Sequence, residues 1–225
     1  MSLPTTLSYA QACDRLTACL ARDGRFILGI IGPPGAGKTT LAARLQANFP
    51  DISQVLPMDG FHLSNTELQR LARRDRKGAP DTFDSLGYTA LLSRVRNQKP
   101  NETVYAPDFD RSIDAALAAS LPIFGDTRLI LAEGNYLAHD QDGWAGVAPL
   151  LDEIWYVGVD PTLRLERLRA RHIRFGRTPE QADQWIQQTD DPNAELIAAT
   201  RVRAHVQVAP DELDELDAPD APGAP

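Results

Sequence analysis

The sequence predicts an α/β fold in which a parallel β-sheet is covered by helices on both faces. Apolar runs of strand length alternate with segments of helical composition along the chain of 225 residues. Strands that alternate with helices are typical of parallel sheets whose connections cover both faces. A glycine-rich loop also lies between the first long apolar run and the helix after it, which is a second mark of this fold class.

Four apolar runs have the length and composition of strands in this sheet. The second run contains Pro57. Because proline cannot donate a hydrogen bond to a neighbouring strand, this strand is expected to end there or to lie near an edge. The predicted strands span residues 26–31, 52–58, 129–132 and 154–159.

Capping residues mark the ends of several predicted helices. Ser8 is a candidate N-cap of the first helix, and Gly24 lies just past its end. Asp160 and Pro161 supply an N-cap and a proline at the first helical position after the last strand. The predicted helices span residues 8–22, 64–76 and 85–97, and two more begin at residues 38 and 161.

The loop after the first strand reads Gly-Pro-Pro-Gly-Ala-Gly-Lys-Thr and fits the phosphate-loop pattern G-x-x-x-x-G-K-[ST]. Glycines let successive backbone N–H groups surround phosphate oxygens, and the N-terminus of the following helix adds a favourable dipole. We expect Lys38 to reach the β- and γ-phosphates of a nucleoside triphosphate and the Thr39 hydroxyl to bind Mg²⁺. The sequence thus predicts a P-loop α/β sandwich. Its expected nucleotide-binding residues are Gly32, Pro33, Pro34, Gly35, Ala36, Gly37, Lys38, Thr39 and Thr40.

Charge and hydropathy narrow the class of protein. No apolar run approaches the ~18 residues that a membrane helix requires. Residues 1–6 lack the basic start and the apolar core of a signal peptide, so a cytoplasmic protein is expected. The net charge is −8, but residues 211–225 hold six acids and no base, which leaves −2 for the rest. We expect one domain over residues 1–210 and an acidic, disordered tail over residues 211–225.

Two acidic residues follow predicted strands, at the edge where such sheets bind their ligands. Asp59 follows the second strand, and Glu133 follows the third. Phosphoryl transfer to an alcohol needs a carboxylate that takes the hydroxyl proton and an acid that holds Mg²⁺ or its waters. We assign Asp59 as the base and Glu133 as the acid near magnesium and substrate. A turn-forming Asp-Gly pair and a helix-capping glutamate are the alternatives.

Four motifs in order carry a resemblance to a known family. They are the glycine loop, Met-Asp-Gly-Phe-His-Leu (58–63), Arg-Lys-Gly-Ala-Pro-Asp-Thr-Phe-Asp (76–84) and Glu-Gly-Asn-Tyr-Leu (133–137). Together they resemble the uridine kinase, phosphoribulokinase and bacterial pantothenate kinase group of P-loop kinases. Within it they are most similar to small bacterial pantothenate-kinase-like or fructose-transport-associated kinases. The resemblance implies a five-stranded parallel sheet, the use of ATP and Mg²⁺, and transfer of the γ-phosphoryl group to a small hydroxyl acceptor. It also implies that Asp59 is the base and that Glu133 lies beside metal and acceptor.

Residues near these motifs are candidate contacts of the acceptor. The segment at 105–111 resembles the group's substrate-side Tyr-x-x-x-x-Asp stretch but lacks the histidine of pantothenate kinases, and the residues typical of the uridine-kinase hairpin are not evident. A basic cluster at 70–77 can hold a carboxylate or phosphate of the substrate, or form an exposed helix face. The candidate acceptor contacts are Asp59, His62, Lys77, Asp110, Arg111, Glu133, Asn135 and Tyr136.

Six arginines and one acid lie between residues 164 and 177. Spacings of three and four residues put four of the arginines on one helical face, namely Arg164, Arg167, Arg171 and Arg174. A cationic stripe repels itself unless an anion neutralises it, and in P-loop kinases such a segment closes over the triphosphate as a lid. A solvated basic face is the alternative. We expect Arg171 and Arg174 to act in catalysis and Arg169 and Arg177 to bind the nucleotide.

The leading interpretation is an ATP-dependent kinase of a sugar-, nucleoside- or pantothenate-like metabolite, with a fructose-type sugar favoured by the resemblance. A regulatory or energy-transducing ATPase without a small-molecule acceptor is the first alternative, and a nucleotide-binding protein that has lost catalysis is the second. The sequence has no Asn-Lys-x-Asp stretch for guanine recognition, and no apolar strand ends in the Asp-Glu pair of ATPase machines. Members of the group often form dimers or tetramers, so a homodimer is a further expectation. Neither a nucleic-acid partner nor a membrane is expected.

Overall fold

The computed structural model describes residues 3–209, so the predicted acidic tail at 211–225 lies outside the described residues. Within residues 3–209 the main sheet has six strands, and every neighbouring pair is parallel. In order across the sheet they are β1 (Thr5–Leu7), β8 (Val206–Val208), β7 (Glu153–Val157), β2 (Phe26–Ile31), β6 (Leu129–Glu133) and β3 (Ser53–Pro57).

The parallel sheet is as predicted, but across residues 3–209 it has six strands and not five. Two strands of three residues each, β1 and β8, pair with one another at one edge. Runs this short give no hydrophobic period that could be detected in the sequence. At the opposite edge β3 ends at Pro57, which agrees with the prediction from the proline.

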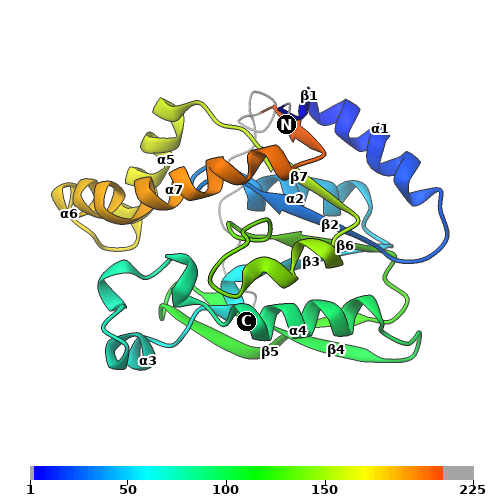
Figure 1. Cartoon of the computed structure of the whole chain (residues 1–225), viewed down its shortest axis with the longest axis horizontal. Coiled ribbons are helices and arrows are strands. Elements are labelled where there is room, and N and C mark those ends of the chain that lie inside the picture. Colours follow the sequence, from blue (N-terminus) through cyan, green and yellow to red (C-terminus); the bar gives the residue numbers. More distant parts are fainter. Residues whose placement is uncertain (1–2, 210–225) are drawn as a thin grey trace.

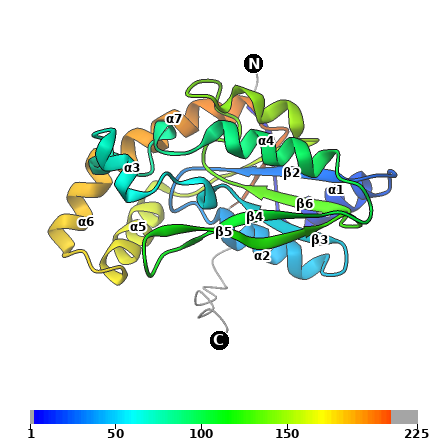
Figure 2. The same cartoon turned by 90° about the horizontal axis from the view of Figure 1, so that it is seen from below.

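Side chains alternate between the two faces of the sheet, and each face packs against helices. In β2, Ile27 and Ile31 belong to the core beneath α4. Leu28 and Ile30 belong to the core beneath α1 and α2. Figure 2 shows α4 on one side of the sheet and α2 on the other. The covering helices are α1 (Tyr9–Leu20), α2 (Lys38–Asn48) and α4 (Ser85–Arg96).

The helix predicted at residues 64–76 is wrong in its C-terminal half, because α3 spans only Asn65–Arg70. Ala72 has a left-handed backbone, with a φ of +54°. The N–H of Arg73 then donates to the carbonyl oxygen of Leu68, which is the bond that ends a helix in the Schellman motif. The basic residues that follow therefore lie on a turn and not on one helical face.

The chain after β7 forms three helices that gather with α3 at one end of the molecule (Figure 1). The Asp160 side chain accepts hydrogen bonds from the backbone of Thr162 and Leu163, so it is the N-cap of α5 as predicted. None of the helices in residues 3–209 is long and apolar enough to cross a membrane. The three helices are α5 (Pro161–Arg174), α6 (Pro179–Trp185) and α7 (Asp191–Ala199), with a π-helical turn at Ile186–Asp190.

A β-hairpin that the sequence analysis did not predict lies beside the main sheet (Figure 2). In it β4 (Thr103–Asp110) pairs antiparallel with β5 (Ala115–Phe124), and residues 111–114 form the turn. Gln54 on the edge strand β3 holds the hairpin in place. Its amide donates to the carbonyl oxygen of Pro122 at 2.7 Å, and its carbonyl accepts from the N–H of Phe124 at 2.8 Å.

Candidate active site

The glycine loop connects β2 to α2 in a conformation suited to an anion. Gly35 and Gly37 have φ angles of +84° and +90°, a region that favours glycine. A Cβ atom on Gly35 would lie 3.0 Å from the carbonyl oxygen of Arg164, so α5 packs directly against the loop. Gly37 caps α2 without a side-chain acceptor. The N–H groups of the first helical turn are therefore oriented toward any anion that enters the loop.

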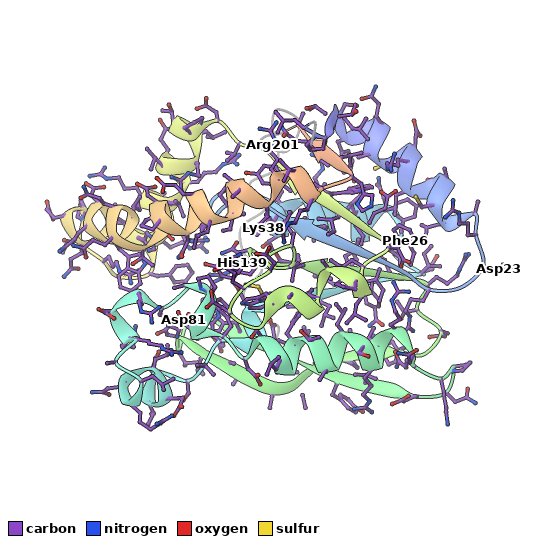
Figure 3. The ribbon with its side chains drawn as sticks, in the orientation of Figure 1. Asp23, Phe26, Lys38, Asp81, His139 and Arg201 are labelled. Atoms are coloured by element: carbon purple, nitrogen blue, oxygen red, sulfur yellow. The ribbon has the colours of Figure 1, made fainter. Side chains whose placement is uncertain are left out.

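Lys38 provides the positive charge of the loop. Its Nζ donates to the carbonyl oxygen of Pro33 at 3.2 Å, and Figure 3 shows the residue near the centre of the view. Burial lowers the pKa of Lys38 to about 8, although the carboxylates of Glu133 and Asp59 act in the opposite direction. The two nearby carboxylates thus help to keep the ammonium charged where it is partly withdrawn from water.

Asp59 and Glu133 meet at the carboxyl ends of neighbouring strands. Glu133 is the last residue of β6 and pairs in register with Pro57 of β3. Asp59 follows two residues later, in the short 3₁₀ turn after β3. The Thr39 hydroxyl donates to Oε1 of Glu133 at 3.3 Å, and Arg111 donates to Oδ2 of Asp59 at 3.1 Å. The structure thus brings the two predicted carboxylates to the glycine loop.

The surroundings push the pKa values of these two carboxyl groups apart. Burial alone would raise the pKa of Asp59, but the positive charges around it, first that of protonated His62 and then that of Arg111, bring it below its usual value. Burial and the negative charge of Asp59 raise the pKa of Glu133. Two carboxyl groups with opposite shifts can take different roles. Asp59 is held ionised and can accept a proton, whereas Glu133 needs a cation to balance its charge.

One cavity of about 450 Å³ brings together the glycine loop, the 3₁₀ turn after β3, the hairpin turn and the end of α5. A second cavity, of about 410 Å³, lies between β3 and the hairpin and shares five residues with the first, so the carboxylates are reached from two sides. The predicted site residues that line the first cavity are Pro34, Lys38, Thr39, Asp59, His62, Lys77, Arg111, Glu133, Asn135, Arg171 and Arg177.

Other predicted residues do not line this cavity within the described part of the chain. Arg169 pairs with Asp183 at 2.8 Å on the surface. The carboxylate of Asp110 accepts from the N–H and the hydroxyl of Ser112. Tyr136 is buried in an aromatic cluster and donates to the carbonyl oxygen of Gly78 at 2.5 Å. Arg174, and the loop residues Gly32, Pro33, Gly35, Ala36, Gly37 and Thr40, are also outside the cavity lining.

Sequence reasoning missed a buried polar chain at the end of α5. Arg177 donates to Nδ1 of His172 at 2.7 Å, so Nε2 of His172 carries the proton that is donated to Oδ2 of Asp190, also at 2.7 Å. The guanidinium of Arg177 also lies 4.1 Å from the centroid of the Trp185 ring. These contacts connect α5, the turn after it and the π-helical turn. His172 and Asp190 are 18 residues apart in the sequence, and no local sequence pattern predicts that they pair.

Aromatic rings form one wall of the same cavity. The His62 ring lies 4.0 Å from the ring of Phe83 and 4.8 Å from that of Phe109, measured between centroids. His62 Nδ1 lies 2.8 Å from the carbonyl oxygen of Asp59, so Nδ1 carries the proton that it donates. All four residues line the cavity. The site therefore combines phosphate-binding charges with an apolar surface for an organic ligand.

The chain is similar to known kinases in sequence and in fold. Residues 27–211 match the family described as "Phosphoribulokinase / Uridine kinase family". A protein of Schizosaccharomyces pombe named "Putative uridine kinase C227.14" is 31% identical over 219 residues, which cover 92% of this chain and 90% of that protein. The crystal structure of a "putative fructose transport system kinase" from Silicibacter sp. TM1040 has a TM-score of 0.81 at 32% identity and covers 89% of this chain and 98% of its own. YFH7 from Saccharomyces cerevisiae shares the fold, with a TM-score of 0.73 at 17% identity over 89% of this chain and 97% of its own.

Proposed function

The chain belongs to the phosphoribulokinase/uridine kinase family of P-loop kinases, and on that premise we propose that it transfers the γ-phosphoryl group of ATP to a hydroxyl group of a small metabolite. One observation carries the proposal: the loop lysine Lys38 and the ionised carboxylate of Asp59 line the same cavity. A kinase needs both, because one group binds the phosphate that is transferred and the other accepts the proton of the attacking alcohol.

In the proposed reaction the acceptor oxygen forms a bond to the γ-phosphorus while the bond from that phosphorus to the bridging oxygen of ADP breaks. Asp59 accepts the hydroxyl proton, and ADP leaves with the electron pair of the broken bond. Lys38 and Arg171 both act on the charge at Asp59 and lie on the cavity wall. We assign them to the stabilisation of the negative charge that develops on the transferred group and on ADP.

The residues present fit a magnesium ion that is shared with phosphate. The Thr39 hydroxyl and the Glu133 carboxylate lie 3.3 Å apart beside the glycine loop and would supply oxygen ligands. Within residues 3–209, no group of three or more His, Cys, Asp or Glu side chains could hold a metal ion. Phosphate oxygens and water would therefore complete the coordination, as Mg²⁺ prefers. When bound, Mg²⁺ neutralises part of the phosphate charge.

The acceptor class is the finer part of the proposal. The relative named as a fructose transport system kinase supports a sugar, and the relative named as a uridine kinase supports a nucleoside. A pantothenate-like alcohol is the third class. We place a fructose-type sugar first on similarity alone, because the side chains around the acceptor select the substrate and the fold does not.

The test is ADP release with Mg-ATP against a panel of sugars, nucleosides and pantothenate. Wild type is compared with Asp59→Asn and with Asp110→Asn, a matched change of a carboxylate outside the cavity. We expect acceptor-dependent turnover that Asp59→Asn lowers by about a hundredfold or more and that Asp110→Asn leaves within about threefold. Hydrolysis that needs no acceptor and is insensitive to Asp59→Asn would instead support the alternative of a regulatory or energy-transducing ATPase.

A further inference from the structure

Three side chains of the segment 65–77 converge on one carboxylate at the cavity. Lys77 Nζ donates to Oδ1 of Asp114 at 2.8 Å and to its carbonyl oxygen at 2.9 Å. Asn65 Nδ2 and Arg74 donate to Oδ2 of Asp114 at 3.0 and 3.1 Å. We call Asn65, Arg74 and Lys77 the carboxylate cradle. The cradle binds both carboxylate oxygens of Asp114, so it has the donors and the geometry that binding of a carboxylate requires.

Lys77 and the carboxylate that it binds differ in how deeply they are buried. The Lys77 side chain is 8% exposed, whereas that of Asp114 is 46% exposed. Asp114 lies in the hairpin turn, and its φ of +52° is in the left-handed region that residues other than glycine adopt uncommonly. A buried ammonium needs an anion beside it, whereas a half-exposed carboxylate returns to water when it leaves. Asp114 is therefore the exchangeable partner of the pair.

An apolar wall connects the cradle with the proposed base. Lys77 Nζ lies 5.0 Å from the centroid of the Phe109 ring, and that ring lies beside His62. His62 in turn is bonded to the backbone of Asp59. All four residues line one cavity. A ligand that lies along this wall has a hydroxyl group at Asp59, its carbon skeleton against the rings and its far end at Lys77.

The charges at that end of the cavity favour an anion. Arg74 and Lys77 carry two positive charges, and within residues 3–209 the carboxylate that pairs with both is that of Asp114. An incoming carboxylate that replaces Asp114 keeps the buried ammonium paired, whereas an uncharged group in the same place would leave it without an anion. A ligand carboxylate is thus the group that can take the place of the Asp114 side chain at this end of the cavity at the lowest cost in free energy.

We propose, on the basis of the kinase function above, that the acceptor is a hydroxy acid whose carboxylate replaces that of Asp114 in the cradle. This narrows the acceptor to sugar acids and pantothenate-like acids, and it ranks them above the uncharged sugar that similarity favours. The hydroxyl group at the other end of the same molecule receives the phosphoryl group.

The test uses acceptors in matched pairs that differ by the acidic group, with Mg-ATP and the full chain. The pairs are glycerate and glycerol, gluconate and glucose, pantothenate and pantothenol, and fructose 6-phosphate and fructose. We expect a carboxylate member to exceed its uncharged partner about a hundredfold in kcat/KM. Lys77→Met should remove this preference, chiefly through KM. Arg70→Met, which breaks an exposed pair with Glu67, is the matched control and should leave the preference unchanged.

Two further variants keep the test decisive if Lys77→Met does not fold. Arg74→Met removes one donor that is 46% exposed and should reduce the preference for the acid by about tenfold. Asp114→Ala removes the competing carboxylate and should lower the KM for the acid. A KM for the acid that rises in Asp114→Ala would show that Asp114 helps to bind the acceptor and would overturn the exchange.

The outcomes separate this inference from the function on which it rests. If wild type phosphorylates no acceptor and hydrolyses ATP alone, the proposed function fails. If it phosphorylates uncharged acceptors with the same kcat/KM as the corresponding acids, the kinase function stands and the hydroxy-acid inference is wrong. A clear preference for fructose 6-phosphate over every carboxylate would also overturn the inference, because the cradle would then hold a phosphate.

Discussion

Arg111, in the turn of the β4–β5 hairpin, donates a hydrogen bond of 3.1 Å to Oδ2 of Asp59, in the 3₁₀ turn after the edge strand β3. The two side chains are 41% and 31% exposed. An ion pair in contact with water can exchange its partner for a ligand at low cost. The hairpin turn therefore acts on the charge of the proposed base and lies at the cavity that the proposed reaction uses.

Arg111→Met should lower kcat/KM by about tenfold and move the acid limb of the pH–rate profile to higher pH. The charge of Arg111 is among those that lower the pKa of Asp59. Its removal raises that pKa, so a larger fraction of Asp59 is protonated at a given acidic pH and cannot accept a proton. Rates of ADP release between about pH 3 and pH 7 measure the shift, because the pKa of Asp59 lies below its usual value. Arg111→Lys keeps the charge and should keep the acid limb in place. An acid limb at the same pH in Arg111→Met and wild type would show that the Arg111–Asp59 pair does not set the pKa of the base.

Arg171→Met should lower kcat by about a hundredfold with little change in the free energy of unfolding. Arg171 lines the cavity, and its charge acts on both Lys38 and Asp59. Arg169 is on the same helix but pairs with Asp183 on the surface. Arg169→Met is therefore the matched control and should stay within about threefold of wild type. Steady-state kinetics with saturating Mg-ATP compare the two. Equal losses in both variants would mean that the lid acts through its total charge and not through one residue.

Local patterns in the sequence were sufficient for much of the fold. The apolar run at β2, the glycine loop and the cap of α5 each depend on residues close together in the chain, and each was predicted from them. The edge position of β3 followed from Pro57. The end of α3 was not predicted, because Ala72 gives no sign in the sequence that it adopts a left-handed backbone. The hairpin was also missed, since its strands are only partly buried and lack a clear alternation.

In the candidate site, too, some residues could be predicted from local sequence patterns and others could not. Lys38, Asp59 and Glu133 could be predicted to lie together because each stands next to a predicted strand or helix, and the topology of a parallel sheet brings such positions to one edge. The pairing of Lys77 with Asp114 spans 37 residues and depends on the hairpin. The pairing of His172 with Asp190 depends on the π-helical turn. Contacts of this kind follow from tertiary structure and have no signature in a single sequence.

Asp190→Ala should lower the free energy of unfolding by about 1–3 kcal/mol. Asp190 and His172 are 6% and 7% exposed, so the change leaves the Nε2–H of His172 buried without its acceptor. Urea unfolding followed by fluorescence gives the loss. Asp183→Ala removes a carboxylate from an exposed pair with Arg169 and should cost less than about 0.5 kcal/mol. A loss in Asp190→Ala no larger than in this control would show that water replaces Asp190 as the partner of His172.

His62 should make the protein less stable as the pH falls through the range where a free histidine gains its proton. Burial lowers the pKa of His62 below its ordinary value of 6.5, although Asp59 acts in the opposite direction. When the pH drops below 6.5, His62 of the unfolded chain binds a proton that His62 of the folded protein does not yet bind. The free energy of unfolding therefore decreases as the pH decreases. His62→Gln removes this group. Between about pH 7.5 and pH 5.5, the Tm of wild type should therefore fall by about 2 °C more than that of the variant. Differential scanning calorimetry of both proteins in the same buffers measures the difference. Parallel curves would mean that His62 takes up its proton in the folded protein as readily as in the unfolded chain.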